Sequence, residues 1–225
     1  MRISTMTLFH CSAILFDLDG VLVDSTKSVS RQWRLWAEER QVDPEEVLRV
    51  AHGVRTIEVL RIFAPYLDAE AEVRRVERRE ADDIDGVAVM PGAAALLRSI
   101  PPESWCVVTS GTRHLATKRL QYANLPAPRV LVSAEDVARG KPDPEPYLKG
   151  AMLLNRKPEE CLVIEDAPAG IRAAHAGGMK AIALTSTFAA SGLGEADSVA
   201  SGLAQIQVRS SAEGKLEVRI EDLAR

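Results

Sequence analysis

Short runs of apolar residues recur along the chain, and each run is followed by a stretch with the spacing of a helix. The five runs are Ala13–Phe16, Trp105–Val108, Arg129–Val132, Leu162–Ile164 and Ala181–Leu184. Because nearly every position in a run is apolar, both faces of each strand must be buried, as in parallel sheets that helices cover. The alternation therefore predicts an α/β fold, a Rossmann-like doubly wound parallel sheet with right-handed crossovers.

One long stretch interrupts this alternation. The first two predicted strands are separated by about 85 residues, far more than one crossover helix requires. Within the stretch, Asp43 followed by Pro44 is typical of a helix N-cap and first turn. We therefore predict an α-helical cap subdomain at residues 25–88, inserted into an α/β core formed by residues 1–24 and 89–225.

The most charged part of the predicted cap is residues 69–84. Its spacing predicts a helix with Val73, Val76 and Ile84 facing inward. The density of charges favours a solvated helix over a binding tail, and we expect Glu77 to face solvent.

Turn signals mark the ends of other elements. Pro168 suits the first turn of a helix, and Gly177–Gly178 suits the end of the same helix. Residues 205–220 alternate between apolar and polar positions around Ala212–Lys215, which predicts a terminal β-hairpin.

The composition excludes several classes of protein. Apolar residues make up 46% of the chain and charged residues 27%, which is typical of globular proteins. The net charge of −4 argues against nucleic-acid or membrane partners. No apolar run approaches the roughly 18 residues of a membrane span, and Met1–His10 lacks the apolar region of a signal peptide. The three cysteines lack metal-ligand spacing and are expected to be buried or edge thiols in a reducing compartment, so we expect a cytoplasmic protein. Nothing in the sequence demands more than a monomer.

The candidate chemistry begins directly after the first predicted strand, where Asp17 and Asp19 stand two residues apart. The carboxyl ends of strands are where open α/β sheets bind ligands. Two such aspartates alone are weak evidence, because turns also favour aspartate.

Three further polar clusters are associated with later strands. Thr109–Gly111 supplies hydroxyls and a flexible backbone at the start of a helix, Lys141 stands on a proline-braced loop, and Glu165–Asp166 supplies two more acids. A parallel sheet would bring these clusters and the first aspartates to one edge. We therefore expect a single site rather than four unrelated loops.

The charges of these clusters make sense only together. The four carboxylates would repel one another and raise one another's pKa unless cations offset them. Lys141 is one such cation, and hard oxygen ligands beside a phosphate suit Mg²⁺ better than zinc or copper. A carboxylate in this setting can attack phosphorus, and a second acid can protonate the leaving oxygen and then deprotonate water.

With these motifs in this order, the chain resembles the haloacid dehalogenase superfamily over roughly residues 12–203. The resemblance is to its Mg²⁺-dependent phosphatases with a helical cap. It implies that Asp17 is the nucleophile and a metal ligand. It also implies that Asp19 is the acid/base, with its backbone carbonyl on the metal, and that Lys141 neutralises the nucleophile and the phosphoryl group.

The resemblance extends to the remaining motifs. It implies that Asp166 is a Mg²⁺ ligand, and that Glu165 either binds the metal directly or supports the residues that do. For the hydroxyl that binds phosphate, it leaves both Thr109 and Ser110 open; we favour Ser110 and include Gly111 in the phosphate site. We expect Arg55, just before a predicted cap helix, to contact the substrate.

A finer likeness lies in His52–Thr56, Val107–Gly111 and Glu165–Ile171, which are similar to a group of sugar and polyol phosphatases. That group includes 2-deoxyglucose-6-phosphate and glycerol-phosphate phosphatases. The likeness implies that the substrate is a small phosphorylated sugar or polyol.

Two other functions remain open at this point. A phosphomutase of the β-phosphoglucomutase type shares core and cap, but the related mutases carry a cap histidine twelve residues after the nucleophile, where this chain has Val29. A catalytically silent binding protein could also keep the fold. The presence of every catalytic residue type argues against that reading.

Overall fold

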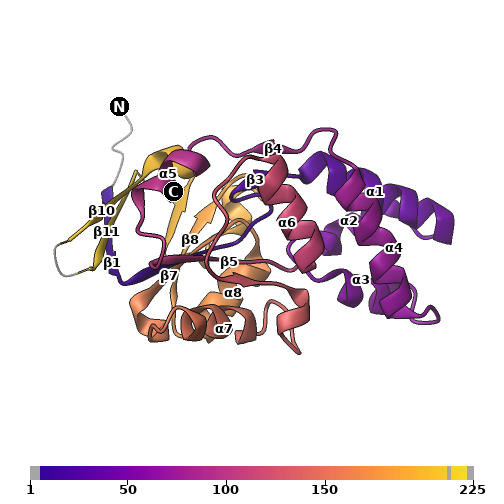
Figure 1. The fold of residues 1–225 in the computed structure, drawn as a ribbon. Coiled ribbons are helices and arrows are strands. Elements are labelled where there is room, and N and C mark those ends of the chain that lie inside the picture. Colours follow the sequence, from indigo (N-terminus) through magenta and orange to yellow (C-terminus); the bar gives the residue numbers. More distant parts are fainter. Residues whose placement is uncertain (1–5, 212–213, 222–225) are drawn as a thin grey trace.

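The computed structural model describes residues 6–211 and 214–221. Its centre is the predicted α/β core, a six-stranded parallel sheet (Figure 1). In spatial order the strands are β6 (Leu131–Val132), β5 (Trp105–Val108), β2 (Ala13–Phe16), β7 (Cys161–Glu165), β8 (Lys180–Leu184) and β9 (Ser198–Ala200).

Helices cover both faces of this sheet. They are α5 (Ala93–Ser99), α6 (Arg113–Tyr122), α7 (Glu145–Leu153) and α8 (Pro168–Ala176). Alternate residues of β2 enter two separate hydrophobic clusters: Ile14 and Phe16 pack in the cluster that includes α5 and α6, and Ala13 and Leu15 in the cluster that includes α7 and α8. The apolar character of both strand faces thus has the predicted cause.

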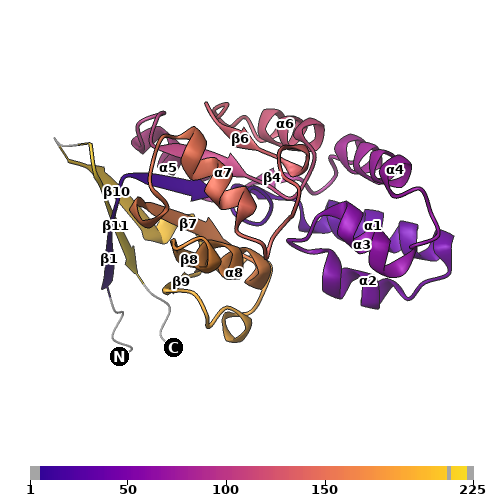
Figure 2. The same ribbon diagram turned by 90° about the horizontal axis from the view of Figure 1, so that it is seen from below.

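Between β3 (Val23–Asp24) and β4 (Ala88–Val89) the chain forms four helices, here called the helical group. They are α1 (Thr26–Arg40), α2 (Pro44–Ala51), α3 (Thr56–Phe63) and α4 (Ala69–Asp82). The group has its own core around the buried Trp33 and Trp36, whose rings meet edge to face at 5.5 Å. Because β3 and β4 pair antiparallel, the chain leaves and rejoins the α/β core at adjacent points (Figure 1). Figure 2 shows the helical group beside the core from below.

The prediction for the charge-rich helix is partly wrong. Val76 is buried as expected, but Ile84 lies beyond the end of α4 and is 49% exposed. The glutamates are the larger correction, since Glu72, Glu77 and Glu80 are all buried. Their burial is possible because donors from neighbouring elements meet each carboxylate.

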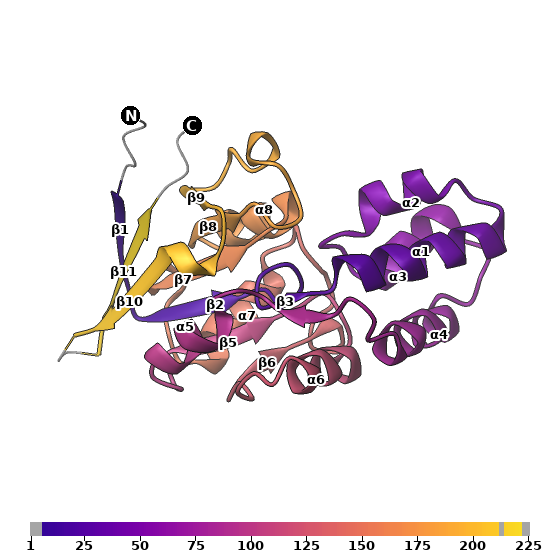
Figure 3. The same cartoon turned by 90° about the horizontal axis from the view of Figure 1, so that it is seen from above.

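A second, three-stranded sheet lies at the end of the molecule opposite to the helical group (Figure 3). The predicted hairpin supplies β10 (Ile206–Ser210) and β11 (Leu216–Glu221), although the centre of its turn, residues 212–213, lies outside the described residues. The third strand, β1 (Met6–Cys11), was not predicted; it pairs antiparallel with β11.

Two smaller expectations can also be compared with the structure. All three cysteines are buried and unpaired, as predicted. Among the described residues, no helix combines the length and apolarity that crossing a bilayer requires.

Candidate active site

Asp17 begins the loop that follows β2, at the carboxyl edge of the sheet. Its backbone N–H donates to the carbonyl of Ile164 at 3.0 Å, which fixes the start of the loop against β7. The chain then turns at Gly20, whose φ of +78° favours glycine. A Cβ at Gly20 would also stand 1.9 Å from Oδ2 of Asp166, so the turn is packed directly against the acid that follows β7.

Lys141 connects the acids of β2 and β7. Its Nζ is buried, contacts Oδ1 of Asp17, and donates to Oε1 of Glu165 at 2.7 Å and to the carbonyl of Val108 at 3.1 Å. Burial alone would lower the pKa of Lys141, but the charges of Asp17 and Glu165 outweigh that effect and raise it. Lys141 is therefore a permanent cation inside the site.

Glu165 uses both of its oxygens on groups of the protein. Oε1 accepts from Lys141 and from the hydroxyl of Tyr147 at 2.7 Å, and Oε2 accepts from the N–H groups of Asp166 and Ala167 at 2.9 and 3.1 Å. Gly170 leaves the space for this carboxylate, since a Cβ there would lie 1.7 Å from Oε1. This saturation suits a brace for Lys141 better than a metal ligand.

The carboxylates form one cluster. Oxygens of Asp17, Glu165 and Asp166 lie within 4.8 Å of one another. Burial, with the charges of Glu165 and Asp19, raises the pKa of Asp17 to about 7 although Lys141 opposes the shift. Burial also raises the pKa of Asp166, and the charges of Glu165 and Asp17 add to the effect.

This donor set fits a hard divalent cation. The hydroxyl of Thr187 donates to Asp166. The ammonium of Lys141, by contrast, bonds to Asp17 and Glu165. A cation between Asp17 and Asp166 would favour the ionised form of both buried carboxylates.

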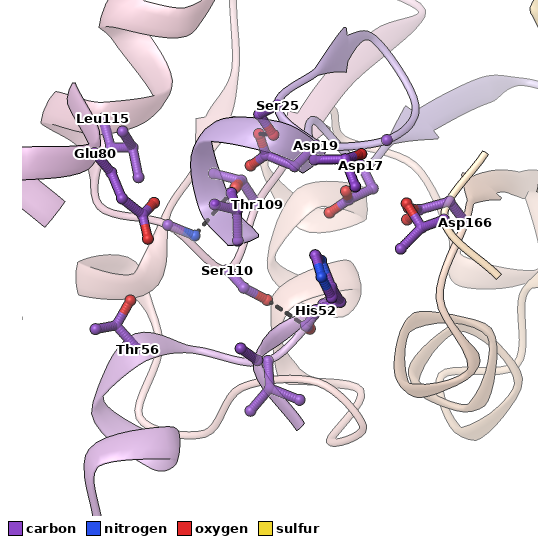
Figure 4. Close-up of a pocket in the computed structure, with 18 of the residues that line it drawn as sticks. Asp17, Asp19, Ser25, His52, Thr56, Glu80, Thr109, Ser110, Leu115 and Asp166 are labelled. Carbon is purple, nitrogen blue, oxygen red and sulfur yellow. Dashed lines mark hydrogen bonds between the residues drawn. The ribbon is translucent and has the colours of Figure 1, made fainter. Parts of the chain in front are cut away.

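Asp19 lies farther out and faces a cavity. Its Oδ1 accepts from the hydroxyl of Ser25 at 2.7 Å, and its Oδ2 pairs with Arg119 at 2.8 Å. In Figure 4, Asp17, Asp19 and Asp166 follow one wall of this cavity, and Glu80 lies apart from them.

The two candidate hydroxyls for phosphate have different partners. Thr109 follows β5, is buried, and its Oγ1 accepts from the N–H of Gly111 at 3.1 Å. The hydroxyl of Ser110 instead donates to the carbonyl of Gly53 in the helical group at 3.1 Å (Figure 4). Both residues line the cavity, so the choice between them stays a prediction.

The cavity lies between the sheet edge and the helical group. Its volume of about 70 Å³ is small beside the roughly 300–1,000 Å³ of ordinary ligand clefts. The helical group lines it with Thr26, Val29, Trp33, Ala51, His52, Gly53, Val54, Thr56 and Glu80. Burial lowers the pKa of His52, so the imidazole is held toward its neutral form.

Arg55 has a different place from the one expected. It is not among the described residues that line the cavity. Its guanidinium pairs with Glu58 at 2.6 Å and donates to the carbonyls of Val137 and Ala138 at 3.3 and 3.1 Å. Arg55 thus joins α3 to the loop that leads to Lys141.

Two residues at the site were missed by the sequence reasoning. Arg119, on α6, and Glu80, on α4, are buried, line the cavity and pair with each other at 3.0 Å. Neither belongs to a motif. The only signal available was a glutamate on the inner side of α4, four residues after Val76.

Comparisons with known proteins agree with this geometry. The family model for haloacid dehalogenase-like hydrolases matches residues 11–178. Hexitol phosphatase A of Escherichia coli K12 is 43% identical over 215 residues, covering 93% of this chain and 100% of that protein. Glycerol-1-phosphate phosphohydrolase 2 of Saccharomyces cerevisiae is 37% identical over 189 residues, covering 79% of this chain and 76% of the relative.

A solved structure supports the same assignment. A hydrolase from Pseudomonas syringae superposes with a TM-score of 0.75 at 27% identity, covering 85% of this chain and 93% of that one. The chain belongs to the haloacid dehalogenase-like hydrolase family. Its relatives place it among the phosphatases of that family, which are phosphomonoester hydrolases.

Proposed function

We propose that this protein hydrolyses phosphate monoesters of small sugars or polyols, with Mg²⁺, through an aspartyl-phosphate on Asp17. The observation that carries the proposal is the buried group of Asp17, Lys141 and Asp166, of which Asp17 and Asp166 line the cavity between the sheet edge and the helical group. The names of the relatives, a hexitol phosphatase and a glycerol-1-phosphate phosphohydrolase, support a small polyol or sugar as the alcohol part.

In the proposed first step, a carboxylate oxygen of Asp17 attacks phosphorus, and the bond from phosphorus to the ester oxygen breaks. Asp19 gives its proton to the departing alkoxide, which leaves as the alcohol. In the second step, Asp19 takes a proton from water as that water attacks the phosphorus of the aspartyl-phosphate. Inorganic phosphate leaves, and Asp17 is free again.

Lys141 and the end of β5 hold the phosphoryl group in this proposal. Lys141 offsets the charge that Asp17 and the phosphate bring together, and Glu165 keeps the ammonium in place. We assign the phosphate hydroxyl to Thr109 and a backbone contact to Gly111. Ser110 serves to hold the helical group, because its hydroxyl is bonded to Gly53.

The metal would be held by Asp17, Asp166 and the backbone carbonyl of Asp19. When bound, Mg²⁺ supplies positive charge that orients the phosphate and stabilises the charge developing on its oxygens. Glu165 is not assigned to the metal, because its oxygens already accept four hydrogen bonds.

We further propose that residues 25–88 act as a cap that opens to admit substrate. The cavity of about 70 Å³ offers little room for a hexitol phosphate while the helical group is docked. Closure would then exclude water during transfer to Asp17.

The proposal is tested by a phosphate-release screen over sugar, polyol, nucleotide and carboxylated phosphate monoesters, with and without Mg²⁺. We expect kcat/KM to be highest for the phosphate monoesters whose alcohol part is an uncharged sugar or polyol. Release from none of these esters would contradict a phosphatase, and a clear preference for nucleotides would contradict the substrate class.

A further inference from the structure

We propose that Arg119 is a positioning residue for Asp19, and that Glu80 of the helical group holds Arg119 in place for this task. The inference rests on the proposed function, because it assigns a role in the same reaction. It concerns how the orientation of Asp19, the proposed acid/base, depends on docking of the cap.

The first observation is the way in which Asp19 is held. Each of its carboxylate oxygens has one partner, Oδ1 the hydroxyl of Ser25 and Oδ2 the Nη1 of Arg119. A general acid must present its carboxyl group in a fixed direction to the leaving oxygen. The pair of partners supplies that direction.

The second observation is that the guanidinium of Arg119 is divided between core and cap. Nη1 is 2.8 Å from Asp19, and Nη2 is 3.0 Å from Oε2 of Glu80. The Arg119 and Glu80 side chains are only 6% and 5% exposed, so their pair is buried, whereas the Asp19 side chain is 29% exposed. Partly desolvated ion pairs of this kind depend strongly on both partners.

Arg119 lines the cavity, but both of its terminal nitrogens are engaged by carboxylates. Its Nε is buried and has no hydrogen-bond partner among the described residues. We therefore assign its influence on the reaction to Asp19 rather than to a direct substrate contact.

Both partners of Asp19 lead to the helical group. Ser25 is the N-cap residue of α1, and Glu80 lies on α4, so the acid/base is tied to the first and the last helix of the group. If the helical group moves away, Arg119 loses Glu80 and Asp19 loses its fixed direction. Asp19 is therefore placed for proton transfer only while the cap is docked, when bulk water is excluded.

The test uses the dependence on the leaving group. The glycerol of glycerol 1-phosphate leaves as an alkoxide, which needs a proton. The p-nitrophenolate of p-nitrophenyl phosphate is a stable anion and leaves without one. For Arg119→Met we expect kcat/KM on glycerol 1-phosphate to fall by about 100-fold, the cost of misplacing a catalytic group by about 1 Å. The pre-steady-state burst of p-nitrophenolate should slow by less than about threefold.

Two further variants keep the inference testable if Arg119→Met folds poorly. Arg119→Lys retains one cation and should recover part of the lost activity on glycerol 1-phosphate. Glu80→Gln should show the same difference between the two esters, but more weakly, because Gln retains an acceptor for Arg119.

Two controls separate this role from general damage. Lys118→Met removes an exposed cation from the neighbouring position of α6 and should leave both rates unchanged. Glu77→Gln weakens a different contact between the cap and the core, to the N–H of Thr112, and should affect both esters equally.

The outcomes are separable. Equal losses on both esters for Arg119→Met and Glu80→Gln, or no loss at all, would overturn the inference. Wild-type protein that hydrolyses neither ester would instead contradict the proposed function. If wild-type protein hydrolyses a different alkyl phosphate, that ester replaces glycerol 1-phosphate in the comparison.

Discussion

At the scale of single residues, the site consists of charges that are costly alone and compatible together. Burial raises the pKa of both Asp17 and Asp166, the negative charge of Glu165 adds to the effect on each, and Lys141 is buried between Asp17 and Glu165. The arrangement leaves a demand for one more cation. The proposed phosphate chemistry and the proposed metal both address this imbalance of charge.

The nucleophile gives the first prediction. Asp17→Asn should reduce phosphate release by at least about 1,000-fold, because an amide cannot form the phosphoenzyme. The fold should persist, with a melting temperature within about 4 °C of wild type, since Lys141 keeps its bond to Glu165. Asp19→Asn should be similarly inactive. Phosphate release and thermal unfolding measure the two effects, and near-normal turnover by pure Asp17→Asn would rule out this nucleophile.

The metal gives the second prediction. EDTA should abolish phosphate release, and added Mg²⁺ should restore it, because Asp17 and Asp166 then have their cation. Ca²⁺ should inhibit, since its longer bonds and looser coordination misplace Asp17 relative to phosphorus. The measurement is the steady-state rate in chelator followed by titration with each ion. Full activity in excess chelator would contradict a metal-dependent reaction.

Glu80 gives a prediction for stability. Burial raises its pKa to about 7, although Arg119 opposes the shift, from an ordinary value of 4.5 in the unfolded chain. Between these pH values the folded state binds more protons, so this contribution to the free energy of unfolding is present below about pH 4.5 and is lost as the pH rises through about 7. Glu80→Gln removes this pH dependence. The difference in free energy of unfolding between variant and wild type should therefore shift in favour of the variant by up to about 3 kcal/mol from pH 4.5 to pH 7.5.

Urea denaturation at several pH values measures this difference. Glu70→Gln, an exposed position on the same helix, is the matched control and should track wild type at every pH. A constant difference between Glu80→Gln and wild type across the range would show that Glu80 ionises normally in the folded protein.

At the scale of elements, the sequence pattern predicted a strand wherever the apolar residues of that strand alone showed that it is buried. β2, β5, β7 and β8 are apolar on both faces, so their burial could be predicted, and topology alone then brought Asp17, Lys141 and Asp166 to one edge. β1 mixes polar and apolar residues and is defined by its pairing with β11, which is distant in sequence. No local pattern contains that information.

The helical group shows the same limit. The burial of Glu77 and Glu80 depends on Thr112 and Arg119 of α6, and so on how the group docks against the core. For the same reason Arg55 was expected at the substrate, whereas it bonds to carbonyls of residues 137 and 138. Docking between subdomains is a tertiary property that residue spacing does not encode.

The position of Arg55 gives a prediction at this scale. Because Arg55 and Glu58 hold α3 against the loop before Lys141, Arg55→Ala should loosen that loop rather than the alcohol site. We expect kcat to fall by a similar factor, about 5- to 50-fold, on a sugar phosphate and on an aryl phosphate. Steady-state kinetics on both esters is the measurement. An effect confined to KM for the sugar ester would restore Arg55 as a substrate contact.

At the scale of the whole molecule, the proposed catalytic groups and the proposed alcohol site belong to different parts of the chain. The sheet edge supplies Asp17, Asp19 and Lys141, and the helical group closes the other side of the cavity. Chemistry and selectivity can therefore differ independently between relatives with this fold. In the proposed mechanism, the phosphoenzyme is either hydrolysed or transfers phosphate to a second hydroxyl, and we expect the choice to depend on what the helical group presents to Asp19.

This dependence separates a phosphatase from a mutase. A mutase must keep water from its aspartyl-phosphate until a second hydroxyl arrives. Val29 of α1 lines the cavity at the position where the related mutases carry a histidine, and it can neither donate nor accept a proton. Asp19 should then activate water whenever the phosphoenzyme forms.

We predict one inorganic phosphate released per sugar or polyol phosphate consumed, with no requirement for a bisphosphate. The experiment supplies β-glucose 1-phosphate with trace glucose 1,6-bisphosphate and follows glucose 6-phosphate and free phosphate together. Isomerisation that exceeds phosphate release by orders of magnitude would make the protein a mutase, with a neighbouring residue such as Ser28 or Arg31 in the role of the histidine.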